Sequence, residues 1–394
     1  MISALFVPKS FHTYADSFLM LGLARLAVSA LNASRQKADI QLIDEGARYR
    51  IQFKRPMNLE TMGQVTYFDF FPFVCGQKSD RRHLPESIIP FNTVEQTEAR
   101  KLYRNYLFQS RSQGEWSEAV PPPPDPSTQN GVLLTSMRHD RNHNGLWLEA
   151  WELREQFGAL LMALFESFSQ PQSWSLDEIL SAVAARFEQQ TGQKFPTQAS
   201  AVKVFLPTAV QGVNRTKADS NKVDSQKTDW LSLWLIAGGL FNLGLAERIK
   251  VADRVYDWRV VALEPRDIQW FKYQRILDDL RCYNPPGGGH GTARFDAELV
   301  LRFCLELLKS HEAEAVDRPE DDLALFGPAN HFVSGFVGTH FGQKGQVYGV
   351  KEVFTLLLPG WVQPSNYQEL QDYQAVLREH LMAIASLCPS WAAS

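Results

Sequence analysis

Four consecutive prolines at positions 121–124, within the segment VPPPPDPSTQ (120–129), constrain the fold more than any other feature of the sequence. Proline lacks a backbone N–H donor and its ring fixes φ, so a proline run favours polyproline II and interrupts helices and sheets. We therefore predict a boundary there, and a second one where helix-type patterns begin to dominate. The predicted parts are an N-terminal α/β part (1–120), a middle part with polar loops (121–265) and a helical C-terminal part (266–394).

Hydrophobic periodicity predicts the elements of the N-terminal part. Thr13 followed by Asp16 resembles a capping box, and the apolar residues after it follow a helical period, so we expect a first helix behind a short strand at 4–7. A turn at Asp44–Gly46 joins two β-type runs within residues 39–54 and predicts a hairpin. Further expected elements are a strand at 65–71 and a helix at 94–111 with a basic and aromatic face.

The middle part combines apolar runs with polar loops. The run VLLTSM (132–137) predicts a buried strand, and RHDRNHNG (138–145) has the composition of a turn. The residues after this turn predict two helices, a short strand and a long exposed polar loop, at 147–168, 174–191, 202–206 and 212–229.

The remaining residues favour helices. We expect helices at 230–246, 267–281, 294–313 and 366–387, with a strand at 256–263. Five glycines between 335 and 349 alternate with Phe, Val and Tyr, which favours strands in a hairpin over a backbone that approaches a polyanion. The sequence therefore predicts an α+β fold, with mixed N-terminal and middle parts and a helix-rich C-terminal part.

Charge and cysteine content limit the class of protein. With 40 Lys and Arg against 44 Asp and Glu, the chain is not a uniformly basic nucleic-acid binder, so any polyanion site needs local segregation of charge. Such segregation exists: residues 25–55 hold seven basic and three acidic residues, and residues 294–322 hold four basic and nine acidic ones. Four cysteines without a CxxC pair favour reduced thiols and hence the cytosol.

No segment predicts a membrane span or an export signal. The most apolar stretch, Leu231–Ala246, is shorter than the roughly 20 residues that a bilayer requires, and it is interrupted by Asn242. The N-terminal apolar region carries Asp16 and Arg25, which do not suit a signal peptide. We therefore expect a cytoplasmic protein without a membrane partner.

His139, Asp140 and His143 are the residues that best suggest metal chemistry. Two histidines four apart share a helical face, and an adjacent His-Asp pair opens some metal-dependent phosphohydrolase sites. The turn composition argues against helical spacing here, and Arg138 and Arg141 would repel a divalent cation. No nucleophile signature or nucleotide-binding glycine motif occurs, so we predict no catalysis, no metal and no cofactor.

Basic and polar loops with interspersed aromatic residues are more suggestive, because this combination suits phosphate contact and base stacking. Three places have it: residues 73–83 together with the 94–111 helix, the 138–145 turn, and residues 214–217. The alternative is a solvated surface with local ion pairs. The predicted nucleic-acid contacts are Lys78, Arg81, Arg82, Arg100, Lys101, Arg104, Arg138, Arg141, Asn142, Asn214, Arg215 and Lys217.

Four segments resemble, in order and spacing, the large subunit of type I CRISPR surveillance complexes (Cascade) in its compact forms: FHTYADSFLMLGLARL, GVNRTKAD, TDWLSLWLIAGGLFNLGL and RVYDWRVVALEP. The resemblance covers residues 11–265 or so. It implies a subunit near the 5′ end of the guide that reads a protospacer-adjacent motif on duplex DNA and helps to open the duplex. The implied partners are crRNA, target double-stranded DNA, other subunits of the complex, and transposition proteins or a separate nuclease.

Some relatives in that family carry an N-terminal HD nuclease domain, whereas the His-Asp pair here follows the proline segment and lacks further ligands. The resemblance therefore implies no nuclease activity. The resulting hypothesis is a non-enzymatic, RNA-guided DNA-binding subunit. Two alternatives remain open: a metal-dependent phosphohydrolase that uses His139 and Asp140, and a scaffolding protein that binds no nucleic acid.

Overall fold

The computed structural model describes residues 1–79, 81, 84–113, 120–170, 175–209, 226–252, 254–283, 291–317, 328–344 and 347–387. The chain forms two compact units. Unit 1 contains residues 1–98 and 127–244, and unit 2 contains residues 99–126 and 245–394.

This division differs from the three consecutive parts expected from the sequence, because each unit consists of two separate stretches of chain. The predicted boundary in the proline segment does coincide with a change of unit: Pro121–Pro124 belong to unit 2, and the chain returns to unit 1 between Pro126 and Ser127. The Cys282 thiol donates a hydrogen bond to the carbonyl oxygen of Pro124 at 3.3 Å. Upstream of the prolines, Arg100 forms an ion pair with Glu247 at 2.8 Å. Prolines end a helix or strand, but side-chain contacts of this kind decide to which unit the segment belongs.

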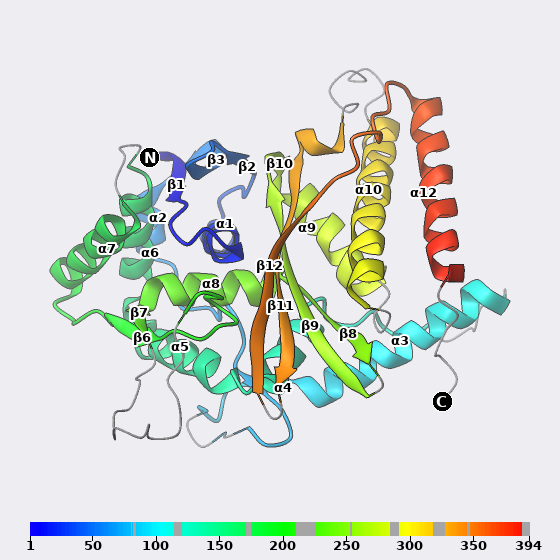
Figure 1. The fold of residues 1–394 in the computed structure, drawn as a ribbon. Coiled ribbons are helices and arrows are strands. Elements are labelled where there is room, and N and C mark those ends of the chain that lie inside the picture. The colour runs from blue at the N-terminus through cyan, green and yellow to red at the C-terminus, as the bar shows by residue number, and fades with distance from the viewer. Residues whose placement is uncertain are drawn as a thin grey trace. The chain divides into compact units, whose positions relative to one another are not determined.

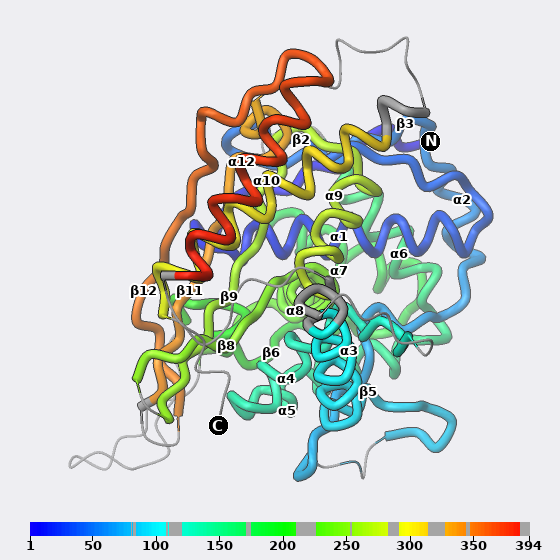
Figure 2. The backbone as a smooth tube through the Cα atoms, turned by 90° about the vertical axis from the view of Figure 1, so that its right-hand side faces the viewer, coloured from blue at the N-terminus to red at the C-terminus, as the bar shows by residue number. Residues whose placement is uncertain are grey.

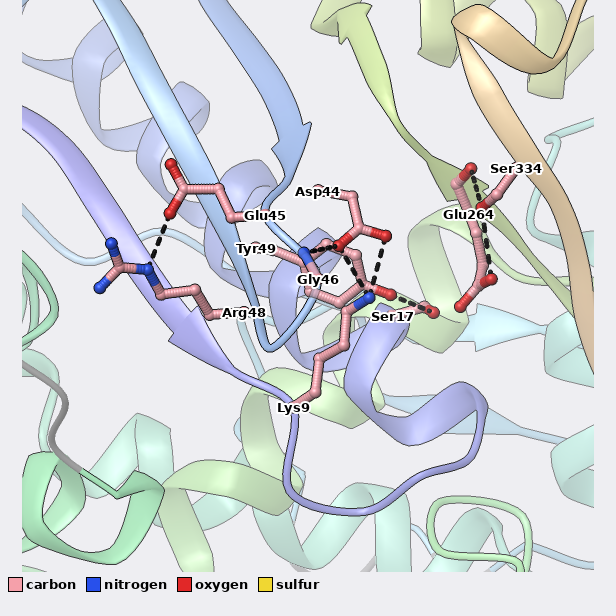
Figure 3. Close-up of polar contacts among 9 residues, drawn as sticks. All are labelled: Lys9, Ser17, Asp44, Glu45, Gly46, Arg48, Tyr49, Glu264 and Ser334. Carbon is pink, nitrogen blue, oxygen red and sulfur yellow. Dashed lines mark hydrogen bonds and ion pairs between the residues drawn. The ribbon is translucent and has the colours of Figure 1, made fainter.

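Unit 1 opens with a split β-α-β arrangement. Strand β1 (Ile2–Pro8) leads to helix α1 (Tyr14–Ala33), and strands β2 (Ile40–Asp44) and β3 (Arg48–Met57) form the predicted hairpin. Strand β3 lies between β1 and β2 and is antiparallel to both. The carboxylate of Asp44 accepts a hydrogen bond from the Gly46 N–H and forms an ion pair with Lys9 (Figure 3). These contacts fix the turn.

Helix α1 packs against α8 (Trp230–Leu243) in the core of unit 1 (Figures 1 and 2). The two backbones meet at Gly22 and Gly239, where a Cβ on either residue would collide with backbone atoms of the other helix. Helix α1 has the length and composition of a membrane span, but 89% of its apolar window is buried inside the fold. It is therefore packed as the core helix of a globular unit.

The start of α1 confirms the predicted N-cap and corrects the capping box. The Thr13 hydroxyl accepts the Ala15 N–H, as an N-cap residue should. The Asp16 carboxylate, however, accepts the backbone N–H groups of Ser10, Phe11 and His12. Asp16 therefore fixes the loop that precedes the helix and does not complete a reciprocal box.

The rest of unit 1 is mainly helical, with two short strand pairs. Its elements are α2 (Leu59–Met62), β4 (Val74–Cys75), β5 (Phe91–Asn92), α4 (Thr128–Ser136), α5 (Asp140–Glu152), η1 (Arg154–Gln156), α6 (Phe157–Phe168), α7 (Leu176–Thr191), β6 (Gln198–Ser200) and β7 (Lys227–Asp229). Strand β4 is parallel to β5, and β6 is antiparallel to β7.

Several predictions for this region are wrong. Residues 132–136 lie in helix α4 with Met137 as its C-cap, and residues 140–145 of the predicted turn form the start of α5. The expected helix at 147–168 is divided at Leu153 into α5 and α6, and residues 65–71 and 202–206 are not strands. A short apolar run has the same pattern in a buried strand and in a buried helix, so periodicity could not separate them.

Unit 2 contains a four-stranded antiparallel sheet of order β12-β11-β9-β8. The strands are β8 (Leu245–Ala252), β9 (Val255–Pro265), β11 (Val333–Lys344) and β12 (Val347–Leu357). The other elements are most of α3 (Thr93–Gln113), β10 (Asp267–Gln269), α9 (Trp270–Asp278), η2 (Asp279–Tyr283), α10 (Gly291–Asp317), η3 (Ala329–His331) and α12 (Tyr367–Leu387). Helices α10 and α12 lie side by side (Figure 1), and the fold class is α+β, as predicted.

Gly335, Gly338, Gly342 and Gly349 of the glycine series fall in strands β11 and β12, which pair as the pattern favoured, and Gly345 lies outside the described residues. A Cβ at Gly338 would collide with Phe354, and one at Gly342 would collide with Lys351. These two glycines therefore make room for side chains of the neighbouring strand, which accounts for them without a polyanion.

Candidate nucleic-acid interface

Two of the three predicted basic loops meet in unit 1 and line one pocket of about 900 Å³. One wall is the turn at Gly76–Ser79, which follows β4. The other wall is the junction between α4 and α5 together with one face of α5. We call this cavity the α5 pocket.

Helix α4 is held in place through Asn130. This side chain is 1% exposed, and its amide nitrogen lies 2.8–2.9 Å from the carbonyl oxygens of Leu240, Phe241 and Gly244. These oxygens belong to the C-terminal end of α8, where carbonyl groups have no partner within the helix. The contact therefore ties one wall of the pocket to the core helix; Figure 2 shows α4 and α5 next to α8.

The turn at Gly76–Ser79 is fixed against α5 by two sets of hydrogen bonds. The Ser79 hydroxyl donates to the Asp140 carboxylate at 2.5 Å and accepts the Gly76 N–H at 2.8 Å. The Asn144 amide accepts the Val74 N–H at 2.9 Å and donates to the Val74 carbonyl at 2.8 Å. The pocket is thus a built structure, with both walls joined by buried or half-buried polar contacts.

Lys78, Arg138 and Arg141 give the pocket its charge. All three side chains are exposed, and none forms an ion pair within the part of the chain that the structure describes. Among the described residues that line the pocket, the one acidic residue, Asp140, is engaged by Ser79. The pocket rim is therefore locally positive although the whole chain has a net charge of −4.

Arg81 lies beside this pocket and contacts Cys75. Burial raises the pKa of the Cys75 thiol, and the charge and hydrogen bond of Arg81 act in the opposite direction. Because burial prevails, Cys75 is a protonated thiol at neutral pH. The exposed guanidinium of Arg81 adds a fourth positive charge to the region.

Arg138 occupies a backbone conformation that normally favours glycine. It follows α4 with φ of 59°, while the His139 N–H donates to the Leu134 carbonyl at 2.8 Å. A residue with a Cβ in this left-handed region costs about 1 kcal/mol or more. His12, Arg35 and Arg254 adopt similar positive φ values, so the conformation by itself assigns Arg138 no role.

His139 and His143 lie at the start of helix α5 and not in the turn that the sequence predicted, but within the described part of the chain they do not form a metal site together. Helical spacing does apply, since α5 begins at Asp140, yet His143 is fully buried with its Nε2 at 3.0 Å from the Pro72 carbonyl. Burial lowers the pKa of both histidines to about 4, so both are neutral at pH 7. Among the described residues no group of three His, Cys, Asp or Glu could hold a metal ion.

The cations of α3 are placed differently. Arg100 is 6% exposed and its guanidinium is paired with Glu247, so it is not available to a nucleic acid; this corrects its inclusion among the predicted contacts. Burial lowers the pKa of Arg104, with Glu247 opposing the shift, and Lys101 is exposed. These α3 residues belong to unit 2, whereas the α5 pocket belongs to unit 1.

The other predicted contacts are one polar residue of α5 and four residues outside the described part of the chain. Asn142 is half-buried in the first turn of α5, where its side chain hydrogen-bonds to His139. Arg82, Asn214, Arg215 and Lys217 lie outside the described residues.

Sequence reasoning missed two features near the pocket. Gly145 lies within α5 and lines the pocket, and a glycine inside a helix was the signal that could have drawn attention to it. Ile89 is 91% exposed in the segment between the turn and β5, and exposure of this kind has no sequence signal. Comparison with known proteins adds no assignment: no protein-family model and no curated protein matches the chain.

Proposed function

We propose that this chain is a non-enzymatic, RNA-guided DNA-binding subunit of a type I CRISPR effector complex, which reads a short protospacer-adjacent motif and assists duplex opening. It works in the cytoplasm with crRNA, target DNA and the other subunits of the complex. The observation that carries the proposal is the α5 pocket. Two basic loops, about 60 residues apart in sequence, converge there and present three exposed cations that have no acidic partner in the described part of the chain.

The chemistry of the pocket suits a nucleic acid better than a small acidic metabolite. Lys78, Arg138 and Arg141 can neutralise several phosphates along a strand, and guanidinium groups can also donate two hydrogen bonds to a guanine edge. Exposed Gln77 and Ser136 at the same pocket add neutral donors and acceptors for base edges. Phosphate contacts supply affinity, and base contacts supply preference for a flanking sequence.

The net charge of −4 supports action within an assembly. A chain that is acidic overall repels DNA at long range, so attraction must come from local positive regions such as the pocket rim. We therefore expect weak duplex binding by the isolated chain and tight, salt-dependent binding by the complex, in which guide–target pairing supplies most of the specificity.

Ile89 supports a role in opening the duplex. Its side chain is 91% exposed and lies four residues before Thr93, a residue of the pocket. Proteins that kink DNA insert apolar side chains such as isoleucine between base steps. We therefore assign to Ile89 the role of the apolar side chain that enters the duplex.

Duplex binding by the complex, reconstituted with the products of neighbouring genes and a guide RNA, tests the proposal at two salt concentrations. Replacing Arg138 and Arg141 together by alanine should weaken binding at least tenfold for every flanking sequence, because phosphate contacts carry no sequence information. The matched control replaces Arg48 and Lys54, which the structure pairs with Glu45 and Asp39. The control should bind within twofold of the wild type.

The same experiment decides between the alternatives. If the variant without Arg138 and Arg141 binds duplex DNA as the wild type does, the loops of the α5 pocket are solvated surface. This result would favour the alternative of a scaffolding protein that binds no nucleic acid. If DNA is cleaved in the presence of Mg²⁺, Mn²⁺ or Ni²⁺ and His139→Ala abolishes cleavage, the phosphohydrolase alternative replaces the proposal.

A further inference from the structure

The α5 pocket contains space that protein packing does not explain. Gly145 lies inside α5, where glycine lowers helix stability relative to alanine. Yet a Cβ built at Gly145 would have no heavy atom within 4 Å. Elsewhere in unit 1, Gly22, Gly158 and Gly239 are required because backbone atoms of another segment occupy the place of a Cβ. Gly145 has no such neighbour and instead borders the open pocket.

We propose that the α5 pocket receives one unstacked nucleotide of a nucleic-acid strand, with its base inside the pocket and its phosphates at the cationic rim. This inference rests on the proposed function and adds the form in which the nucleic acid is bound. Glycine at position 145 lets the ligand approach the helix backbone closely, which a side chain would prevent.

The interior of the pocket has the chemistry of a nucleobase site. Phe73, 2% exposed, and Thr93, 5% exposed, line it together with half-buried Leu148. Apolar contact on the faces of a base and hydrogen bonds on its edge are how proteins hold an extruded base. The exposed hydroxyl of Ser136 can donate to or accept from the edge, whereas the hydroxyls of Thr93 and Thr135 already donate to backbone carbonyl oxygens and can only accept.

The size and the rim of the pocket agree with a single nucleotide. A volume of about 900 Å³ lies within the range of ligand pockets, about 300–1,000 Å³, and is far too small for a duplex. Lys78, Arg138 and Arg141 line the same pocket and are exposed, so the sugar–phosphate backbone can continue past the pocket while one base enters it. A free mononucleotide has the same chemistry, and the experiment must separate it from a strand.

A duplex series with 2-aminopurine at successive positions of the flanking sequence tests the inference in the assembled complex. Unstacking raises 2-aminopurine fluorescence, so we expect a severalfold increase at one position with the wild type. Gly145→Met places a side chain on the α5 wall of the pocket, where the base would lie, and should abolish the increase at that position. Ser181→Met, at an exposed position of α7, is the matched control and should keep the increase. If Gly145→Met does not fold, Ser136→Trp at the exposed, pocket-lining end of α4 serves the same purpose.

The outcomes separate this inference from the proposed function. Tight duplex binding without a fluorescence increase at any position overturns base insertion and leaves the proposed function intact. Loss of all nucleic-acid binding overturns both. A titration of the isolated protein with AMP and CMP forms the second arm. If the protein binds a free nucleotide, if Gly145→Met abolishes that binding, and if no strand binds, the ligand of the pocket is a free nucleotide and the assignment to a strand is overturned.

Discussion

The cations of the α5 pocket and two buried arginines of unit 2, Arg100 and Arg259, contrast in what surrounds them. In unit 2, Arg259 is 2% exposed, pairs with Asp296 and Glu352, and lies 3.7 Å from the centre of the Phe354 ring. Arg100 is likewise buried against Glu247. The pocket cations are exposed and have no acidic partner among the described residues. The number of arginines in a sequence therefore says little about function. Whether an arginine is available to a ligand depends on whether an acidic side chain lies next to it in the fold.

The arginines of the β2–β3 hairpin in unit 1 are intermediate between these two cases, because they are paired with an acidic residue but partly exposed. Arg48 and Arg50 both contact the Glu45 carboxylate, at 2.8 and 2.7 Å, with about a third of each arginine side chain exposed. Figure 3 shows the Arg48 pair beside the Lys9–Asp44 pair. The three acidic residues of the basic segment 25–55 are all paired, but Glu45 serves two arginines and Asp44 pairs with Lys9, so the excess of basic residues remains in the fold. Such exposed pairs add little stability, typically less than about 1 kcal/mol each.

The largest effect should come from breaking a buried pair of unit 2. Glu247→Ala leaves the buried guanidinium of Arg100 without its acid, and we expect the free energy of unfolding to fall by about 3 kcal/mol. Urea denaturation measures this, with Glu45→Ala as the exposed control that should cost less than about 1 kcal/mol. Equal effects of the two changes would contradict the contrast between buried and exposed pairs.

A second prediction concerns the pH dependence of stability that the buried side chain of His143 causes in unit 1. Burial lowers the pKa of His143 to about 4, below the value of about 6.5 in an unfolded chain. The unfolded chain therefore binds a proton that the folded chain does not, and stability falls as the pH drops from about 6.5 to 4. At pH 5 the loss from this residue is about 2 kcal/mol relative to pH 7. His143→Gln should reduce the difference in unfolding free energy between pH 7 and pH 5 by that amount; an unchanged difference would mean that His143 is protonated in the folded state.

Gly145→Ala should stabilise unit 1. The new methyl group enters open space, and alanine is the better helix former, so we expect a gain of about 0.5–1 kcal/mol in the free energy of unfolding. Gly22→Ala is the contrasting variant and should destabilise, because its Cβ collides with the backbone of α8. Thermal unfolding of both variants compares them; a destabilised Gly145→Ala would show that the pocket wall is more tightly packed than described.

Arg138→Gly should change stability least: the free energy of unfolding should rise slightly, whereas the affinity for duplex DNA should fall. Glycine relieves the left-handed conformation but adds freedom to the unfolded chain, so the free energy of unfolding should rise by no more than about 0.5 kcal/mol. Loss of the guanidinium should nevertheless weaken duplex binding severalfold. Parallel unfolding and binding measurements test both; a more stable variant with full affinity would remove Arg138 from the interface.

Patterns that span several turns or carry a specific residue signal were predicted well. The helices at 174–191 and 366–387 correspond to α7 and α12, and the turn at Asp44–Gly46 is observed with Gly46 at φ of 87°. The run 132–137 was misassigned as a strand, because six apolar-rich residues fit either type of element and packing of α4 against α8 decides between them.

The sequence by itself determined the α+β class, the apolar helices of the core and the residues that could contact a nucleic acid, because these depend on periodicity and side-chain chemistry. Only the tertiary structure decided which of those residues belong together. It joined Lys78 to Arg138 and Arg141 in one pocket and assigned Arg100 to Glu247. Coulomb interactions and desolvation act between groups that are close in space, and the folded chain brings together residues that are far apart in sequence.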